Sequence, residues 1–153
     1  MRAIPLLTLL ALGAGAARAE PGEKSPPDRA GEIAVEVTGF RSDKGTALVA
    51  VYASARGFPD QPGKALFKKA VAIHGRTART VFRRVPPGTY AVGVLHDEDG
   101  DHRMKIGFLG IPKEGYGASR DARGRFGPPR FEDARLPLGA GQKLTSAIRM
   151  IYH

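Results

Sequence analysis

The 153-residue sequence contains no cysteine and no tryptophan, and only 7% of its residues are aromatic. The absence of cysteine excludes disulfide bonds, thiolate metal ligands and a thiol nucleophile. No serine lies in a Gly-x-Ser-x-Gly motif, and no His-Glu-x-x-His zinc motif occurs. We therefore expect a non-catalytic domain, stabilised by its hydrophobic core alone.

Long hydrophobic runs are also missing, apart from one at the N-terminus. Met1 and Arg2 form a short positive region, residues 3–16 are uncharged and rich in Leu and Ala, and Ala17-Arg18-Ala19 is a small-x-small site. This order is typical of a secretory signal peptide. The apolar run is too short to span a membrane, which needs about 20 residues. We predict that residues 1–19 are a signal peptide cleaved after Ala19. The alternatives are an uncleaved anchor and a buried helix.

Residues 20–31 carry three prolines, two glycines and five charges but no large apolar side chain. A segment of this composition cannot bury a core, so we predict a disordered Pro-rich linker. Residues 32–153 remain for one folded domain, which we expect to be periplasmic or secreted and to have no transmembrane segment.

The charge is strongly basic, with 24 Lys and Arg against 15 Asp and Glu and a formal net charge of +9. Loss of Arg2 and Arg18 with the signal peptide leaves 22 basic residues and a net charge of +7. Such a charge attracts anionic surfaces, although scattered basic residues can equally be solvated surface charge. An exported protein rarely meets nucleic acid. We therefore expect an anionic envelope component or a protein as partner, and no nucleic acid.

Alternation of apolar and polar residues is the dominant pattern, as expected for half-buried strands. It predicts strands over residues 32–37, 46–53, 70–74, 77–85, 89–96 and 143–152, with a further strand-like run over 131–138. In the fourth of these, Val81, Arg83 and Val85 share one face. Only residues 61–69 could form a turn or two of helix. The sequence thus predicts an all-β fold, an antiparallel β-sandwich of about seven strands with one long glycine-rich loop.

That loop runs from Asp97 to Arg130 and contains seven glycines and three prolines. Apolar side chains recur in it, so we expect it to pack down on its own side chains; these residues are Ile106, Phe108, Leu109, Ile111, Tyr116 and Phe126. A loop of this length inside a compact domain is commonly functional. We therefore take it as the candidate binding surface.

Four segments carry a family resemblance: PGTYAV at 87–92, HDEDGD at 96–101, GIPKEGYG at 110–117 and FGPPRFEDA at 126–134. In this order and spacing they resemble the signature of the bacterial domain-of-unknown-function 2141 family, over about Glu32 to Tyr152. The resemblance implies an exported protein without an established activity. The Pro-Gly-x-Tyr strand start also resembles transthyretin-like sandwiches, which implies a prealbumin-type fold by analogy.

The acidic turn at the start of the loop is a candidate metal site. Asp97, Asp99 and Asp101 match positions 1, 3 and 5 of a calcium loop, which makes calcium the one candidate cofactor. The resemblance implies a turn-forming glycine and a further carboxylate, yet this sequence has His102 and Lys105 at those places and Phe108 where a bidentate Glu would close the site. The alternative is an acidic surface turn that pairs with neighbouring basic residues.

Basic and aromatic side chains in the rest of the loop are suited to binding an anion or a protein. The candidate ligand-binding residues are His96, Lys113, Glu114, Tyr116, Arg120, Arg125 and Arg130. In the alternative, the loop closes onto the sandwich, with Phe131 in the core and the arginines in water. Two other functions stay open: an envelope hydrolase that uses the loop carboxylates, and a purely structural envelope component.

Overall fold

The computed structural model describes residues 29–153, so the predicted signal peptide and residues 20–28 of the predicted linker lie outside the described residues. Its strands are β1 (Gly31–Thr38), β2 (Thr46–Tyr52), β3 (Phe67–Ala72), β4 (Thr77–Val85), β5 (Gly88–Asp97), β6 (Tyr116–Ala118), β7 (Leu136–Leu138) and β8 (Lys143–Arg149). The helical turns are η2 (Pro62–Lys64), η3 (Phe108–Gly110), η4 (Ser119–Asp121) and α1 (Phe131–Ala134). Within residues 29–153 no helix has the length and apolar character needed to cross a membrane.

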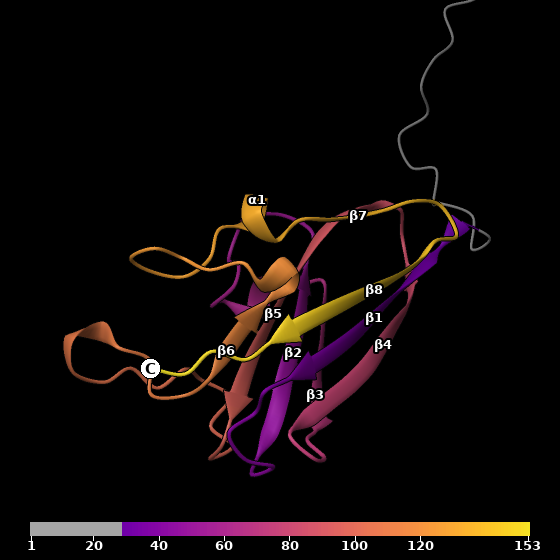
Figure 1. Cartoon of the computed structure of the whole chain (residues 1–153). Helices are drawn as coiled ribbons and strands as arrows, with labels where there is room; N and C mark the ends of the chain where they lie inside the picture. The colour runs from indigo at the N-terminus through magenta and orange to yellow at the C-terminus, as the bar shows by residue number, and fades with distance from the viewer. Residues whose placement is uncertain (1–28) are drawn as a thin grey trace, which may run out of the picture.

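Two sheets pack into a sandwich, as Figure 1 shows. One sheet has the order β4-β1-β8, and the other has the order β3-β2-β5-β6 with β7 paired to β5. The predicted all-β sandwich is therefore confirmed, with eight strands rather than about seven. The predicted single loop at 97–130 is wrong, because the strand β6 divides it in two. One pairing departs from the antiparallel expectation, because β1 and β8 run parallel, with Ile33 opposite Leu144. These strands come from opposite ends of the chain, so no hairpin fixes their relative direction.

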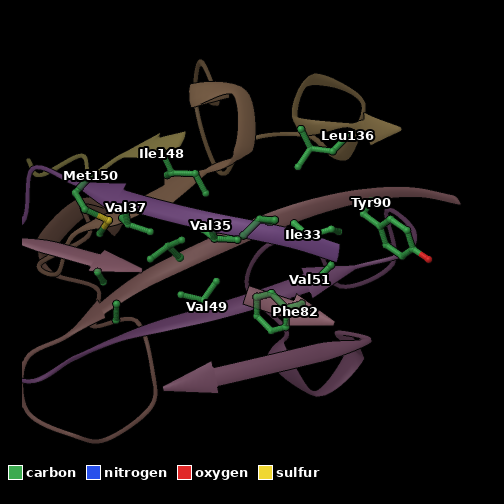
Figure 2. Close-up of a cluster of buried hydrophobic side chains, with 14 of the residues drawn as sticks. Ile33, Val35, Val37, Val49, Val51, Phe82, Tyr90, Leu136, Ile148 and Met150 are labelled. Atoms are coloured by element: carbon green, nitrogen blue, oxygen red, sulfur yellow. The ribbon is translucent and has the colours of Figure 1, made fainter. Parts of the chain in front are cut away.

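The main core lies between the two sheets (Figure 2). Ile33, Val35 and Val37 alternate inward from β1, and each is at most 2% exposed. Val49 and Val51 of β2 face them from the other sheet. The predicted alternation in the first strand is thus confirmed, and burial of these side chains is the largest favourable term for the fold.

A second, smaller cluster covers the opposite face of β2 and β5. Tyr52 is 1% exposed and forms an edge-to-face contact with Phe58, which in turn contacts Phe131. Phe131 therefore packs as the loop-closing alternative expected, although in this outer cluster and only partly buried. It belongs to the short helix α1 and not to a strand, and the strand β7 begins only at Leu136. This layer explains why β2 is apolar on both faces.

The face assignment in β4 was wrong because the strand contains a β-bulge. Arg83 pairs with Glu32 while Val85 pairs with Gly31, so Arg84 is the extra residue, and its φ is 56°. Upstream of the bulge Phe82 faces the core and Val81 faces outward; after it Val85 is fully buried. An inserted residue shifts the alternation by one, which a strict period of two cannot anticipate.

Two smaller differences concern the boundaries of predicted elements. The strand β1 begins at Gly31, so the last residue assigned to the linker is already part of the sheet. The predicted helical turn at 61–69 is limited to η2, and β3 begins at Phe67, three residues before the predicted strand.

Candidate functional site

The acidic turn at the end of β5 is held by a buried carboxylate. Asp97 is fully buried, its Oδ1 accepts the backbone N–H of Gly100 at 2.8 Å, and its Oδ2 accepts that of His102 at 3.1 Å. Each oxygen thus satisfies one N–H of the turn that follows, which offsets the cost of burying the charge. The Asp97 carboxylate therefore stabilises the turn that follows it.

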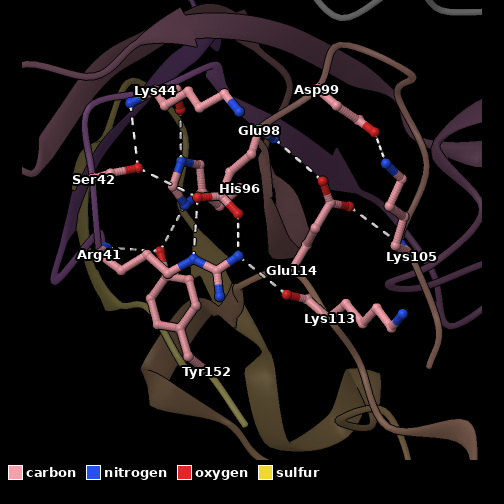
Figure 3. Close-up of polar contacts among 10 residues, drawn as sticks. All are labelled: Arg41, Ser42, Lys44, His96, Glu98, Asp99, Lys105, Lys113, Glu114 and Tyr152. Carbon is pink, nitrogen blue, oxygen red and sulfur yellow. Dashed lines mark hydrogen bonds and ion pairs between the residues drawn. The ribbon is translucent and has the colours of Figure 1, made fainter. Parts of the chain in front are cut away.

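Glu114 performs the same task from the far side of the loop (Figure 3). It is 4% exposed, and its two carboxylate oxygens accept the backbone N–H groups of Glu98 at 3.3 Å and Lys105 at 3.2 Å. These bonds tie the outgoing and returning arms of the β5–β6 loop together. The base of the loop is therefore an internally bonded polar unit.

The structure brings together a different set of carboxylates from the one that the spacing predicted. Oxygens of Asp97, Asp99 and Glu114 all lie within 4.8 Å of one another. Asp101 is outside this cluster; it is exposed and accepts the backbone N–H of Arg103 at 2.8 Å. Glu114 is 17 residues beyond Asp97 in the chain, so only the hairpin of the loop brings it near. The Asp99 carboxylate forms an ion pair with the ammonium of Lys105.

His96 is fully buried at the foot of the same loop, with both ring nitrogens bonded. Nε2 lies 2.8 Å from the carbonyl oxygen of Lys44, and Nδ1 lies 2.8 Å from the hydroxyl of Tyr152. A carbonyl can only accept, so Nε2 carries the hydrogen and Nδ1 accepts from the tyrosine. The tyrosine oxygen in turn accepts the backbone N–H of Arg41 at 3.1 Å. His96 thus links three segments of the fold and offers no nitrogen to a ligand.

Arg41 fastens the loop to the sandwich from outside. Its guanidinium pairs with both carboxylate oxygens of Glu98, donates to the carbonyl oxygen of Lys113 at 3.2 Å, and lies 5.0 Å from the centroid of the Tyr152 ring (Figure 3). The hydrogen bonds from Arg41 hold the pKa of Glu98 below its ordinary value, and the same pairing raises the pKa of Arg41. Planar, two-pronged pairing of this kind is what arginine provides and lysine does not.

The lowered pKa of Glu98 makes a prediction for acid stability. Because the unfolded chain binds the proton more readily than the folded one, this pair stabilises the fold above the ordinary value of 4.5, and the contribution is lost as the pH falls below it. Glu98→Gln should therefore be less stable than the wild type at neutral pH and approach it in acid. Thermal unfolding from about pH 3 to pH 7 measures this. Parallel curves for the two proteins would contradict it.

The far ends of the loop region are apolar and exposed. Phe108 is 85% exposed, Leu109 is 80% exposed, and Phe126 in the following loop is 97% exposed. The expectation that these side chains pack down on the loop is therefore wrong. A bridge between Ile106 and Pro112 closes the first loop into a hairpin, and its tip points away from the sheets. Side chains at such a tip have no neighbouring element on which to pack.

The basic candidates on the loop are exposed, as a binding surface requires: Lys113, Arg120, Arg125 and Arg130. Arg130 forms an ion pair with Asp133 at 3.2 Å, whereas Tyr116 stacks on His153 with 5.7 Å between ring centroids. The predicted ligand-binding set is thus divided by the structure. His96 and Glu114 lie inside the base of the loop, and the others lie at its surface.

Sequence reasoning missed the residues that fasten the loop, Arg41, Glu98 and Tyr152. They come from three separate parts of the chain, and no local pattern links them. It also missed the exposed tips, for which a signal does exist: Lys105 and Lys113 bracket the short apolar run IGFLGIP. Two glycines and a proline interrupt this run between the two lysines, and such residues are not typical of the interior of a core strand.

Comparison with known protein families gives a match over most of the chain. Residues 35–146, more than two thirds of the chain, match the family model described as "Uncharacterized protein conserved in bacteria (DUF2141)". No curated protein and no solved structure matches the chain. The transthyretin-like part of the fold expectation accordingly stays a prediction. Together with the motifs that line the β5–β6 loop, the match shows that this chain belongs to the DUF2141 family of bacterial proteins.

Proposed function

We propose that this protein is exported to the periplasm or beyond and serves as a non-catalytic binding or accessory module of the cell envelope. One observation carries the proposal. Of the six large apolar side chains that are exposed within residues 29–153, five lie between Ile106 and Phe126. Exposed apolar side chains that gather in one region commonly mark an interaction site. The sixth, Leu66, lies before β3 at the opposite edge of the same sheet.

The N-terminal sequence supports the export part of the proposal. A positive start, an uncharged Leu- and Ala-rich run and a small-x-small site occur in the order that signal peptidase requires. The absence of cysteine is compatible with an oxidising compartment, because no thiol is exposed to mispairing.

The bonding of the polar groups supports a non-catalytic role. A general acid or base needs a carboxylate or imidazole that can reach the proton it transfers. Both oxygens of Asp97 and both of Glu114 accept backbone N–H groups, and both nitrogens of His96 are bonded within the fold. These groups hold the loop in shape and leave its outer surface for binding. An envelope hydrolase would need carboxylates free of such bonds.

The export test uses the full chain expressed in a bacterial host. We expect the accumulated protein to fractionate with the periplasm or medium and, by intact mass, to begin at Glu20. Leu9→Arg places a charge in the apolar run and should leave an unprocessed protein in the cytoplasm. An unprocessed wild-type chain in the cytoplasm would overturn the proposal.

The binding test uses the processed wild-type protein. After purification it is mixed with isolated cell envelopes and sedimented. We expect most of it to be recovered with the envelopes, and the double variant Phe108→Ser/Leu109→Ser to remain in solution. Wild-type protein that stays in the supernatant would show that the loop surface is not a binding site.

Calcium binding is a second candidate function, favoured by the cluster of Asp97, Asp99 and Glu114. Hard oxygen ligands of this kind suit calcium, but Lys105 already neutralises Asp99. Removal of the lysine in Lys105→Met should therefore strengthen binding. Titration calorimetry with calcium up to about millimolar concentration tests both proteins, and no heat from either would end this candidate.

A further inference from the structure

We infer that the partner of the exposed loops is the surface of an anionic phospholipid bilayer. The inference rests on the proposed function and names the chemistry of the partner. These loops carry five exposed apolar side chains: Ile106, Phe108, Leu109 and Ile111 on the β5–β6 hairpin, and Phe126 on the loop between η4 and α1.

The shape of the region favours a flat, deformable partner. Both loops extend beyond the sheets toward the same side of the molecule in Figure 1, at the end where the C-terminus lies. Pockets for small ligands are concave and lined by side chains that converge. Here Phe108, Leu109 and Phe126 stand outward on convex loops, with at most a fifth of their surface covered. A bilayer interface can receive side chains that project in this way.

The hairpin is built so that its apolar side chains cannot fold back. The N–H of Gly107 bonds the carbonyl oxygen of Ile111 at 2.7 Å, and the N–H of Lys113 bonds that of Lys105 at 2.8 Å. At the tip Leu109 adopts a φ of 59°, a left-handed conformation that non-glycine residues avoid. At the base Glu114 clamps both arms. The tip is thus held away from the sheets before any partner arrives.

Charge complementarity identifies the sign of the surface. Lys113 stands at one end of the apolar hairpin, and Arg123 and Arg125 precede Phe126; Lys105, at the other end of the hairpin, is paired with Asp99. Residues 102–113 and 122–131 contain no Asp or Glu. Apolar side chains that insert, ringed by cations that remain among head groups, are the arrangement by which peripheral proteins bind anionic bilayers. A neutral protein groove would gain nothing from the basic ring.

The first test measures the binding of the processed protein to protein-free vesicles. Sedimentation with vesicles that contain phosphatidylglycerol is compared with vesicles of phosphatidylcholine alone. We expect strong binding only to the former, and weaker binding as salt rises. Phe108→Ser/Leu109→Ser should reduce the partition coefficient roughly tenfold or more, whereas Leu66→Ser, at the other edge of the sheet, should leave it unchanged. Equal partition of the three proteins would overturn the inference.

The second test reports insertion directly. Because the sequence has no tryptophan, Phe108→Trp introduces a single fluorophore at the tip of the hairpin. Its emission should move to shorter wavelength on vesicles and be quenched by brominated acyl chains. Leu66→Trp is the matched control and should show neither effect. An unchanged emission spectrum of the Phe108→Trp variant on vesicles that bind the protein would also overturn the inference.

The two proposals fail in different ways. Binding to isolated envelopes without binding to protein-free vesicles overturns the lipid inference and leaves the binding function in place, with an envelope protein or glycan as partner. Absence of binding to both overturns the function as well.

Discussion

Replacing Asp97 with alanine is expected to lower the free energy of unfolding by about 2–3 kcal/mol and to loosen the whole acidic turn. The reason is that its two oxygens accept the N–H groups of Gly100 and His102, which have no other acceptor in the turn. Urea unfolding measures the loss in stability. Amide hydrogen exchange should show faster exchange at residues 100 and 102.

Asp101→Ala is the matched control, since it removes a negative charge from the same turn, four residues after Asp97. Asp101 is exposed and bonds only the nearby N–H of Arg103, so we expect a change below about 0.5 kcal/mol. Comparison of Asp97→Ala with Asp101→Ala distinguishes a structural role of the acidic turn from a role in metal binding. If the three aspartates acted as equivalent metal ligands, both variants would lose calcium binding alike and neither would unfold. Equal stability of the two variants in the absence of metal would contradict a structural role for Asp97.

Gly45→Ala is expected to have a larger effect, about 3–5 kcal/mol. Gly45 has a φ of +72°, which a residue with a Cβ adopts only at a cost. A Cβ at this position would also collide with the carbonyl oxygen of Asp97 and lie 2.7 Å from the Cα of Glu98. Both are backbone atoms and cannot rotate away. The start of β2 would separate from the end of β5, at the point where the acidic turn begins. Thermal unfolding should show a loss of roughly 10–20 °C.

Two other glycines provide controls for the two contributions. Gly141 shares the positive φ, 65°, but a Cβ there meets nothing within 4 Å, so Gly141→Ala should cost about 1–2 kcal/mol. Gly63 has neither constraint, and Gly63→Ala should be close to neutral. If all three substitutions cost the same, close approach of β2 to the acidic turn would not be what requires glycine at position 45.

The sandwich was predictable because its signal is local. Ile33, Val35 and Val37 alternate in the sequence and alternate in the core, and the apolar strand β2 is central as its composition indicates. The error in β4 has an equally local cause that composition conceals. Arg84 occupies a bulge with positive φ, a conformation that glycine or asparagine ordinarily adopts. An arginine at this position therefore does not indicate a bulge.

The candidate site was less predictable because contacts between distant residues build it. Spacing along the chain placed Asp101 in the acidic cluster, yet the loop brings Glu114 there instead. The fastening of the loop depends on Arg41 and Glu98, which are 57 residues apart. Phe108 and Phe126 are exposed because no other element within residues 29–153 covers them, and the periodicity of the sequence does not predict this. A short apolar run predicts burial only where another element covers it.

The parallel pairing of β1 with β8 sets the order of events when the chain folds. The first sheet needs residues from both ends of the domain, and Ile148 and Met150 close the core beside Val37. Until residues 143–150 have been synthesised, β1 has only β4 to pair with, and one side of the core stays open to water. Late closure of this kind keeps a nascent chain unfolded for longer. The sheet β4-β1-β8 can therefore be complete only after β8 has left the ribosome.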